Sequence, residues 1–223
     1  MKKTLFALLT LTSFSAHSAL FQGTSSGNFV NPTGPLGFIS TGAGTNQFTW
    51  GTGVTGSPPS SLGYAGRKFD IDENSAFIFG TISYFNGEIE GSSGATSVDL
   101  NAGLDFASPF AKKESFTFNL GLINTPNTAD PNASADIVNF DNKVPSNFFS
   151  FNGTDFTLEF LGFGTLTGAG FTLEDSFRVL EGESASVDLI GRITSNPVPV
   201  PAAVWLFGSG LIALITIRRR HQP

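Results

Sequence analysis

Apolar and polar residues alternate along three long stretches of this chain. The stretches are "SVDLNAGLDF" (97–106), "ESFTFNLGLI" (114–123) and "TDFTLEFLGF" (154–163). Their apolar positions recur at every second residue: Val98, Leu100, Ala102, Leu104 and Phe106, then Phe116, Phe118, Leu120 and Leu122, then Phe156, Leu158 and Phe160. A period of two residues is that of a β-strand with one face on a core and the other in water. The pattern therefore predicts half-buried strands in all three stretches.

Turn signals extend this prediction to most of the chain. Asn86-Gly87 and Asn152-Gly153 stand between apolar runs, and Asn-Gly is a favoured pair for tight hairpin turns. No convincing 3.6-residue periodicity occurs between the two ends of the chain, and its 24 Phe supply core volume. We predict an all-β, antiparallel β-sandwich of jelly-roll type over residues 19–195. The connections 51–67 and 123–135 look long, and sandwiches usually carry binding sites on such loops.

The N-terminal end has a different pattern, typical of a secretory signal peptide over residues 1–18. Lys2 and Lys3 precede an apolar stretch from Leu5 to Phe14, and small residues follow at Ala16, Ser18 and Ala19. We expect cleavage after Ser18, with cleavage after Ala19 as the second choice. An uncleaved membrane anchor is the alternative interpretation.

The C-terminal end, residues 196–223, resembles a membrane segment. Residues 198–217 carry no charge, and a helix of that length spans about 30 Å, the thickness of a bilayer core. Proline is tolerated only in the first turn of a helix, so we expect the transmembrane helix over about 202–217. Arg218, Arg219 and Arg220 follow and favour a cytoplasmic position for this end. A buried core helix is the alternative, and an arginine triplet at its end argues against it.

The domain between these ends is acidic. Five of the 12 Lys and Arg residues lie in the end segments, whereas all 18 Asp and Glu lie between them, which leaves a net charge of −11. An anionic surface argues against nucleic acid and anionic lipid as partners. The chain has no Cys, so its fold depends on the hydrophobic core without disulfides, and a domain of about 175 residues is large enough for that.

Few residues of this domain can carry catalytic or metal chemistry. The two histidines, His17 and His221, lie in the end segments. This excludes Ser-His-Asp triads, Cys-His proteases and zinc sites built on imidazole or thiolate, and we expect no cofactor. The segment "DIDEN" opens like a calcium-binding EF-hand loop, but Ser75 stands at the sixth position, where that loop requires Gly, and Thr81 at the twelfth. The candidate calcium ligands that remain are Asp70 and Asp72, or Asp130, Asn132 and Asp136, and the preferred explanation for them is solvated turn residues and strand ends.

Two further classes of site depend on residues that are present. A glycoside hydrolase needs two facing carboxylates, for which Glu88 with Glu90, Glu159, or Glu174 with Asp175 are the candidates. We expect Glu88 and Glu90 to point to solvent together, and we predict no enzymatic activity. A carbohydrate-binding module needs exposed aromatic rings, and its candidates are Trp50, Tyr64 and Tyr84. Because Trp50 alternates with Phe48, a core position is the preferred interpretation for it.

The C-terminal segment resembles the sorting signal of PEP-CTERM proteins. The matching features are the motif Val198-Pro199-Val200-Pro201, the short apolar helix that begins "PAAVWLFGSGLIAL", and the cluster Arg218–Arg220. The resemblance implies that an exosortase, a membrane enzyme of Gram-negative bacteria, reads and processes this segment near the prolines. Val200 stands where the namesake motif has Glu, which leaves the cut position open.

The exported part is similar to the domain called choice-of-anchor K, which is related to the THxN group. The similarity lies in five pieces: "FTWG" (48–51), "ISYFNGEI" (82–89), "NTPNTADPNASADIV" (124–138), "LEFLGF" (158–163) and "FRVLEGESAS" (177–186). Where the THxN group has its Thr-His-x-Asn, this chain has Ser83-Tyr84-Phe85-Asn86. The family's name describes attachment, and the resemblance carries over no established activity.

These observations lead to one functional expectation with two alternatives. We expect an exported protein that is held briefly in the inner membrane, then reaches the cell surface or the exopolysaccharide matrix and carries a non-enzymatic interaction domain. Its expected partners are an exosortase and extracellular polysaccharide or other surface components. The alternatives are a carbohydrate-binding module and a carboxylate-dependent glycoside hydrolase.

Overall fold

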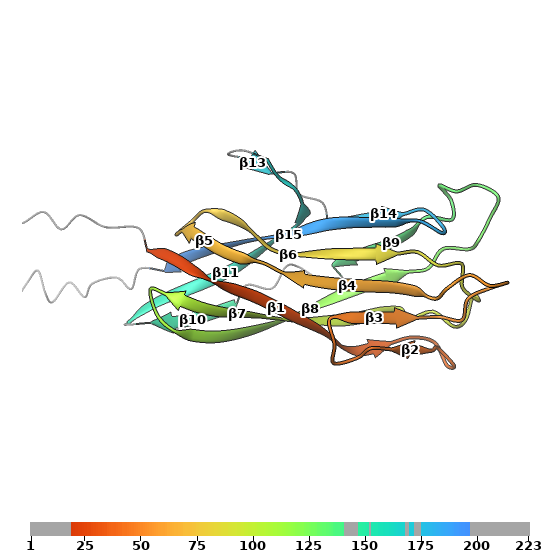
Figure 1. Cartoon of the computed structure of the whole chain (residues 1–223), viewed down its shortest axis with the longest axis horizontal. Helices are drawn as coiled ribbons and strands as arrows, with labels where there is room; N and C mark the ends of the chain where they lie inside the picture. Colours follow the sequence, from red (N-terminus) through yellow and green to blue (C-terminus); the bar gives the residue numbers. More distant parts are fainter. Residues whose placement is uncertain (1–18, 141–146, 152, 168–169, 172–174, 197–223) are drawn as a thin grey trace, which may run out of the picture.

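A computed structural model describes residues 19–140, 147–151, 153–167, 170–171 and 175–196 (Figure 1). All regular structure in these ranges is β-strand, so the all-β prediction is confirmed. The predicted signal peptide (1–18) and the sorting segment, with Val198–Pro201 and Arg218–Arg220, lie outside the described residues. Within the described ranges, no helix combines the length and the hydropathy that crossing a bilayer requires.

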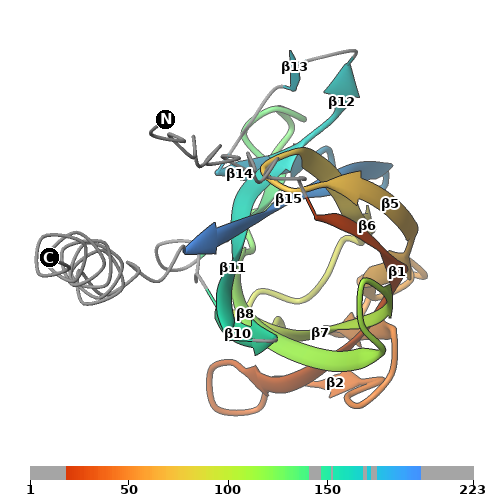
Figure 2. The ribbon, with the colours of Figure 1, turned by 90° about the vertical axis from the view of Figure 1, so that its left-hand side faces the viewer.

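The strands form two curled antiparallel sheets that pack against each other (Figure 2). The six-stranded sheet has the order β14 (Ser176–Val179), β9 (Asp136–Phe140), β8 (Lys112–Ile123), β7 (Ser97–Ser108), β1 (Leu20–Thr33) and β5 (Lys68–Asp72). The seven-stranded sheet has the order β10 (Asn147–Phe151), β11 (Thr154–Gly164), β15 (Ser184–Asn196), β6 (Ala76–Phe85), β4 (Ser60–Gly66), β3 (Gln47–Trp50) and β2 (Ser40–Thr41). A separate two-stranded ribbon consists of β12 (Leu166–Thr167) and β13 (Gly170–Phe171).

The alternating apolar residues form the core, as predicted. The apolar positions of all three stretches are buried, and the polar residues between Val98 and Phe106 face outward from β7. Phenylalanine rings join the two sheets: Phe79 on β6 lies edge-on to Phe118 on β8, with ring centroids 6.3 Å apart. Edge-to-face contacts of this kind add to the hydrophobic gain from burial.

The two sheets share one nearly continuous strand, because β4 leads directly into β5. At the crossing point Ser25 of β1 donates from its hydroxyl to the Phe79 carbonyl and accepts a 2.8 Å hydrogen bond from Arg67 N. Phe79 sits where the register between β6 and β15 slips by one residue, so its carbonyl needs a partner outside that ladder. Gly66 must lack a side chain here, since a Cβ would lie 2.0 Å from the Ser25 carbonyl oxygen.

Two turn predictions had different outcomes. Phe151 pairs with Thr154, so the predicted hairpin between β10 and β11 is confirmed, with Gly153 at φ 78°; Asn152 lies outside the described residues. The hairpin predicted at Asn86-Gly87 was wrong, because β6 ends at Phe85 and its next neighbour in sequence, β7, belongs to the other sheet. Asn86 is fully buried and bonds to the β14–β15 turn instead.

The long connections gather at one end of the molecule. Segment 124–135 is a connection, as predicted, whereas 51–67 includes strand β4, so only 51–59 is irregular. Both lie at the right-hand end of Figure 1, while β1 begins and β15 ends at the left-hand end. A 12-residue strand such as β7 extends for roughly 40 Å, which gives the scale of the separation.

Candidate functional site

The connections at the right-hand end of Figure 1 enclose a pocket of about 490 Å³. We call it the loop-end pocket; its lining consists of residues 88–91, Gly94, 124–127, Val54 and Asp136. Three of these side chains are carboxylates and none is basic. The pocket therefore presents hydrogen-bond acceptors and negative charge to a ligand.

Asp136, the first residue of β9, is a buried carboxylate of this pocket. Only 3% of its surface is exposed, and burial raises the pKa of its carboxyl. One oxygen accepts from Thr125 N at 2.7 Å and from the Thr125 hydroxyl at 3.1 Å, while the other accepts from the Tyr84 hydroxyl at 3.3 Å. These bonds fix the start of segment 124–135 to the end of β6.

Aromatic residues support the pocket from inside the core. Trp50 stacks on Tyr84 with ring centroids 5.6 Å apart, and its indole N–H donates to Asn124 Oδ1 at 3.0 Å. The Asn124 amide in turn donates to the Ala95 carbonyl at 2.7 Å. Burial, followed by the charge of Asp136, raises the pKa of the Tyr84 phenol far above its usual range, so Tyr84 serves as a neutral donor.

Backbone pairing holds the rim of the pocket. Gly53 bridges Ile89, Val54 N donates to the Glu88 carbonyl at 2.9 Å, and Glu90 N donates to the Thr52 carbonyl at 2.9 Å. Because Ile89 points into the core, the side chains of Glu88 and Glu90 on either side of it are exposed. The predicted solvent-facing pair is thus confirmed, and it stands at the pocket entrance.

The turn between β14 and β15 adds a fourth acidic group, Glu181, beside the three carboxylates of the pocket. Glu181 is partly buried, and neither of its carboxylate oxygens has a hydrogen-bond partner among the described residues. Burial, with the negative charges of Asp136 and Glu88, raises the pKa of the Glu181 carboxyl to about 7. The group therefore changes its charge near neutral pH.

The predicted aromatic binding residues are all in the core. Trp50, Tyr64 and Tyr84 are 1–2% exposed, so they form no stacking surface for a sugar ring. The Tyr64 hydroxyl donates to the Phe79 carbonyl at 3.2 Å, and its ring lies against Gly27 and Gly80. The core position preferred for Trp50 is confirmed. Tyr64 and Tyr84, the other two candidates, are core residues as well, because period-two alternation carries all three side chains inward.

The calcium candidates do not lie together: Asp136 is buried in the loop-end pocket, and the others are exposed elsewhere. Asp70 and Asp72 are exposed on β5, and Asp70 accepts from the Gln22 amide at 3.0 Å. Asp130 is exposed in a turn, where it accepts from Asn132 N at 3.0 Å. In the part of the chain that the structure describes, no three His, Cys, Asp or Glu side chains come together in a metal-binding arrangement.

The remaining carboxylate candidates do not face each other across a cleft. Glu159 on β11 binds Arg192 of the neighbouring strand β15, with its Oε2 2.9 Å from Nε. Asp175 is exposed at the edge of the other sheet, and Glu174 lies outside the described residues. Among the described residues, Glu88 with Glu90 is therefore the one candidate pair in which both carboxylates line a pocket.

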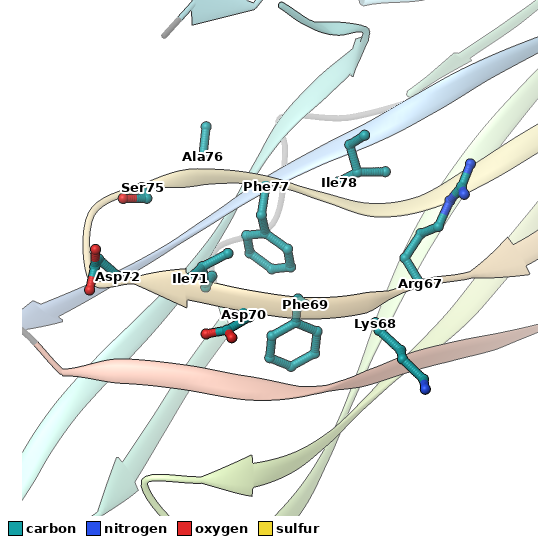
Figure 3. Close-up of a pocket in the computed structure, with 10 residues that line it drawn as sticks. All are labelled: Arg67, Lys68, Phe69, Asp70, Ile71, Asp72, Ser75, Ala76, Phe77 and Ile78. Atoms are coloured by element: carbon teal, nitrogen blue, oxygen red, sulfur yellow. The ribbon is translucent and has the colours of Figure 1, made fainter. Parts of the chain in front are cut away.

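A second depression, of about 560 Å³, lies between β5 and β6 (Figure 3). It forms because β5 leaves the ladder that β4 makes with β6 and joins β1 instead. Phe69 and Phe77 pack side by side across it, with ring centroids 5.4 Å apart. Arg67 and Lys68 lie towards one end and Asp70 and Asp72 towards the other, so this open groove has mixed charge.

No family model matches the chain, and no curated protein matches it. The geometry alone therefore identifies the candidate site. The sequence pointed to the connection 123–135 as a place for a binding site, to Glu88 and Glu90 as a solvent-facing pair, and to Asp136 only as a candidate calcium ligand. Sequence reasoning missed Glu181 and Asn86, because their contacts join β6, β9 and the β14–β15 turn across long distances in sequence.

Proposed function

We propose that this chain is an exported cell-surface or matrix protein of a Gram-negative bacterium that an exosortase-type system sorts. In this proposal residues 1–18 are a signal peptide, 202–217 a transmembrane helix, and Val198–Pro201 the region of processing. The exported domain is a jelly-roll-like sandwich of the choice-of-anchor K type. It acts as a non-enzymatic interaction module.

The observation that carries this proposal is the position of the loop-end pocket. The last described strand, β15, ends at the opposite end of the domain from the pocket-lining connections (Figure 1). A segment that follows Asn196 and stays in a membrane holds that end near the bilayer. The acidic pocket then faces outward, at a distance of roughly 40 Å set by strands of 12 residues.

Expression of the full chain and of a chain that ends at Pro197, in a Gram-negative host with an exosortase, tests the sorting proposal. Cells, membranes and medium are separated and the protein is followed in each. We expect the full chain first in the membrane fraction and later as a shortened product at the surface, and the truncated chain as a free species. The same distribution for both chains would contradict the proposal.

A second candidate function, carbohydrate binding, is favoured by the chemistry of the loop-end pocket. Glu88, Glu90 and Asn127 offer carboxylate and amide groups that bond to sugar hydroxyls, and Val54 with Pro126 adds apolar surface. A glycan array probed with the full chain and with Glu88→Gln/Glu90→Gln tests it. We expect binding that the double variant loses; equal signals from both proteins would exclude this site.

A further inference from the structure

The turn between β14 and β15, residues 180–183, contains a buried carboxyl group that no hydrogen-bond donor among the described residues contacts. Glu183 N donates to the Leu180 carbonyl at 3.1 Å, and Gly182 takes the positive φ of 74° that such a turn requires. Glu181 lies between them, and both its oxygens are shielded from solvent and accept no hydrogen bond from the described residues. A buried carboxylate without donors is costly, whereas a neutral carboxyl is much less so.

The charges that act on Glu181 make its ionised form still less favourable. Asp136 on β9 and Glu88 after β6 are both negative, and the phenol of Tyr84 on β6 also interacts with it. On its own hairpin, Glu183 and Arg178 are exposed. Loss of the Glu181 proton thus places a third negative charge beside Asp136 and Glu88.

The same turn is fastened to the end of β6 by one residue, Asn86. Gly182 N donates to the Asn86 carbonyl at 2.7 Å, and Asn86 N donates to the Glu183 carbonyl at 3.0 Å. The Asn86 side-chain amide donates to the Val179 carbonyl at 3.0 Å. Asn86 is fully buried, so these three bonds hold the turn closed against the body of the protein.

We propose that turn 180–183 is a pH-responsive latch beside the loop-end pocket, closed on Asn86 while Glu181 is protonated and released when Glu181 is ionised. On release the proton goes to water, and the turn swings outward so that the carboxylate becomes hydrated. That movement breaks the three bonds to Asn86. Because Glu88 and Asp136 belong to the pocket and act on Glu181, release changes the electrostatic environment of its wall. The latch does not depend on the proposed function.

The ordinary pKa of a glutamate, 4.5, and the value of about 7 for Glu181 define the working range of the latch. The folded turn keeps its proton to a higher pH than an open, hydrated turn does. The closed state is therefore most favoured at low pH and loses its advantage as the pH rises towards 7. Above that range the open state is populated more.

Limited trypsin digestion of the full chain from pH 5.5 to pH 8.5 tests the latch. Arg178 is exposed on β14, next to the turn, and its cleavage requires local opening of the strand, whereas Lys113 on β8 provides an internal reference. We expect cleavage after Arg178, relative to Lys113, to rise about fivefold over this range. Glu181→Gln, which keeps a neutral side chain, should show less than about a twofold change. Glu183→Gln removes an exposed carboxyl from the same turn and should behave like the wild type.

Two outcomes would overturn the latch: an unchanged ratio in the wild type, or the same rise in Glu181→Gln. Circular dichroism establishes that each variant is folded before digestion. If Glu181→Gln does not fold, Glu88→Gln decides the question, because it removes one of the two negative charges acting on Glu181. The midpoint of the rise must then move to lower pH, and an unmoved midpoint would refute the proposal.

Discussion

Trp50 and Asn124 lie 74 residues apart in sequence and are joined by a 3.0 Å hydrogen bond from the indole N–H to Oδ1. The bond connects the aromatic core to segment 124–135, which borders the loop-end pocket. It shows how this fold positions its loops. Buried aromatic side chains extend a polar atom to a loop amide, and that amide bonds back to the opposite connection at Ala95.

Removal of the Asn124 amide should therefore destabilise the protein. Asn124→Ala leaves the Trp50 N–H and the Ala95 carbonyl without partners, and we expect a loss of about 1–3 kcal/mol in the free energy of unfolding. Urea denaturation measures it. Asn127→Ala, an exposed change in the same segment, is the matched control and should stay within about 0.5 kcal/mol. Equal stability of both variants would show that the hydrogen bond from the indole contributes nothing to the free energy of unfolding.

The hydroxyl of Ser25 should also stabilise the protein, at the point where the chain crosses from β4 to β5 between the sheets. Ser25→Ala removes one of the two hydroxyl donors to the Phe79 carbonyl and the acceptor for Arg67 N, and we expect a cost of about 1–3 kcal/mol. Ser26→Ala, one position along β1 with its side chain exposed, should change stability by less than about 0.5 kcal/mol. Thermal unfolding compares the two; a similar melting temperature would contradict the assignment.

The raised pKa of Glu181 predicts a pH dependence of stability. The folded chain holds this proton up to about 7, whereas the unfolded chain releases it near 4.5, so stability falls as the pH rises between these values. We expect the wild type to lose about 1–2 kcal/mol relative to Glu181→Gln between pH 5 and pH 8, a value reduced for solvent screening. Urea unfolding at both pH values measures the difference. An opposite sign would mean that the carboxylate has a stabilising partner.

Calcium should change the stability of the protein only slightly. The acidic domain attracts the ion diffusely, and two of the candidate ligands, Asp72 and Asp136, lie on different strands. We expect millimolar calcium to move the melting temperature by no more than about 1 °C. A larger rise that disappears in Asp72→Ala or Asp136→Ala would reveal a defined site.

Two separate changes in the C-terminal segment should alter its membrane retention and its processing. Replacement of Arg218–Arg220 with neutral residues removes the stop at the cytoplasmic edge, so we expect weaker retention and release of uncut protein. Replacement of Pro199 and Pro201 with Ala lets the helix continue, so we expect uncut protein that stays in the membrane. Mass spectrometry of the mature C-terminus distinguishes these products. The parent product from both variants would show that the tail is not a sorting signal.

The sequence predicted what depends on local alternation. The segment from Val98 to Phe106 was predicted as a strand because every second side chain is apolar. In the structure these apolar side chains are buried and the ones between them face outward. The Asn86-Gly87 signal failed because a turn pair specifies a hairpin only if the next strand belongs to the same sheet. The contacts of Asn86 with Gly182 and Glu183, and of Asp136 with Tyr84, depend on which strands become neighbours. The alternation of apolar and polar residues within a strand does not indicate which strands will become its neighbours.

The place of β15 in its sheet has a consequence for the order of assembly. It is the last described strand, yet it lies inside the seven-stranded sheet, between β11 and β6. The halves of that sheet on either side of it cannot join until residues 184–196 are available. A chain that emerges N-terminus first therefore holds β6 and β11 with unpaired edges until its final strand is free, and such edges are prone to aggregation. Whatever delays the emergence of residue 196 also delays folding of the domain.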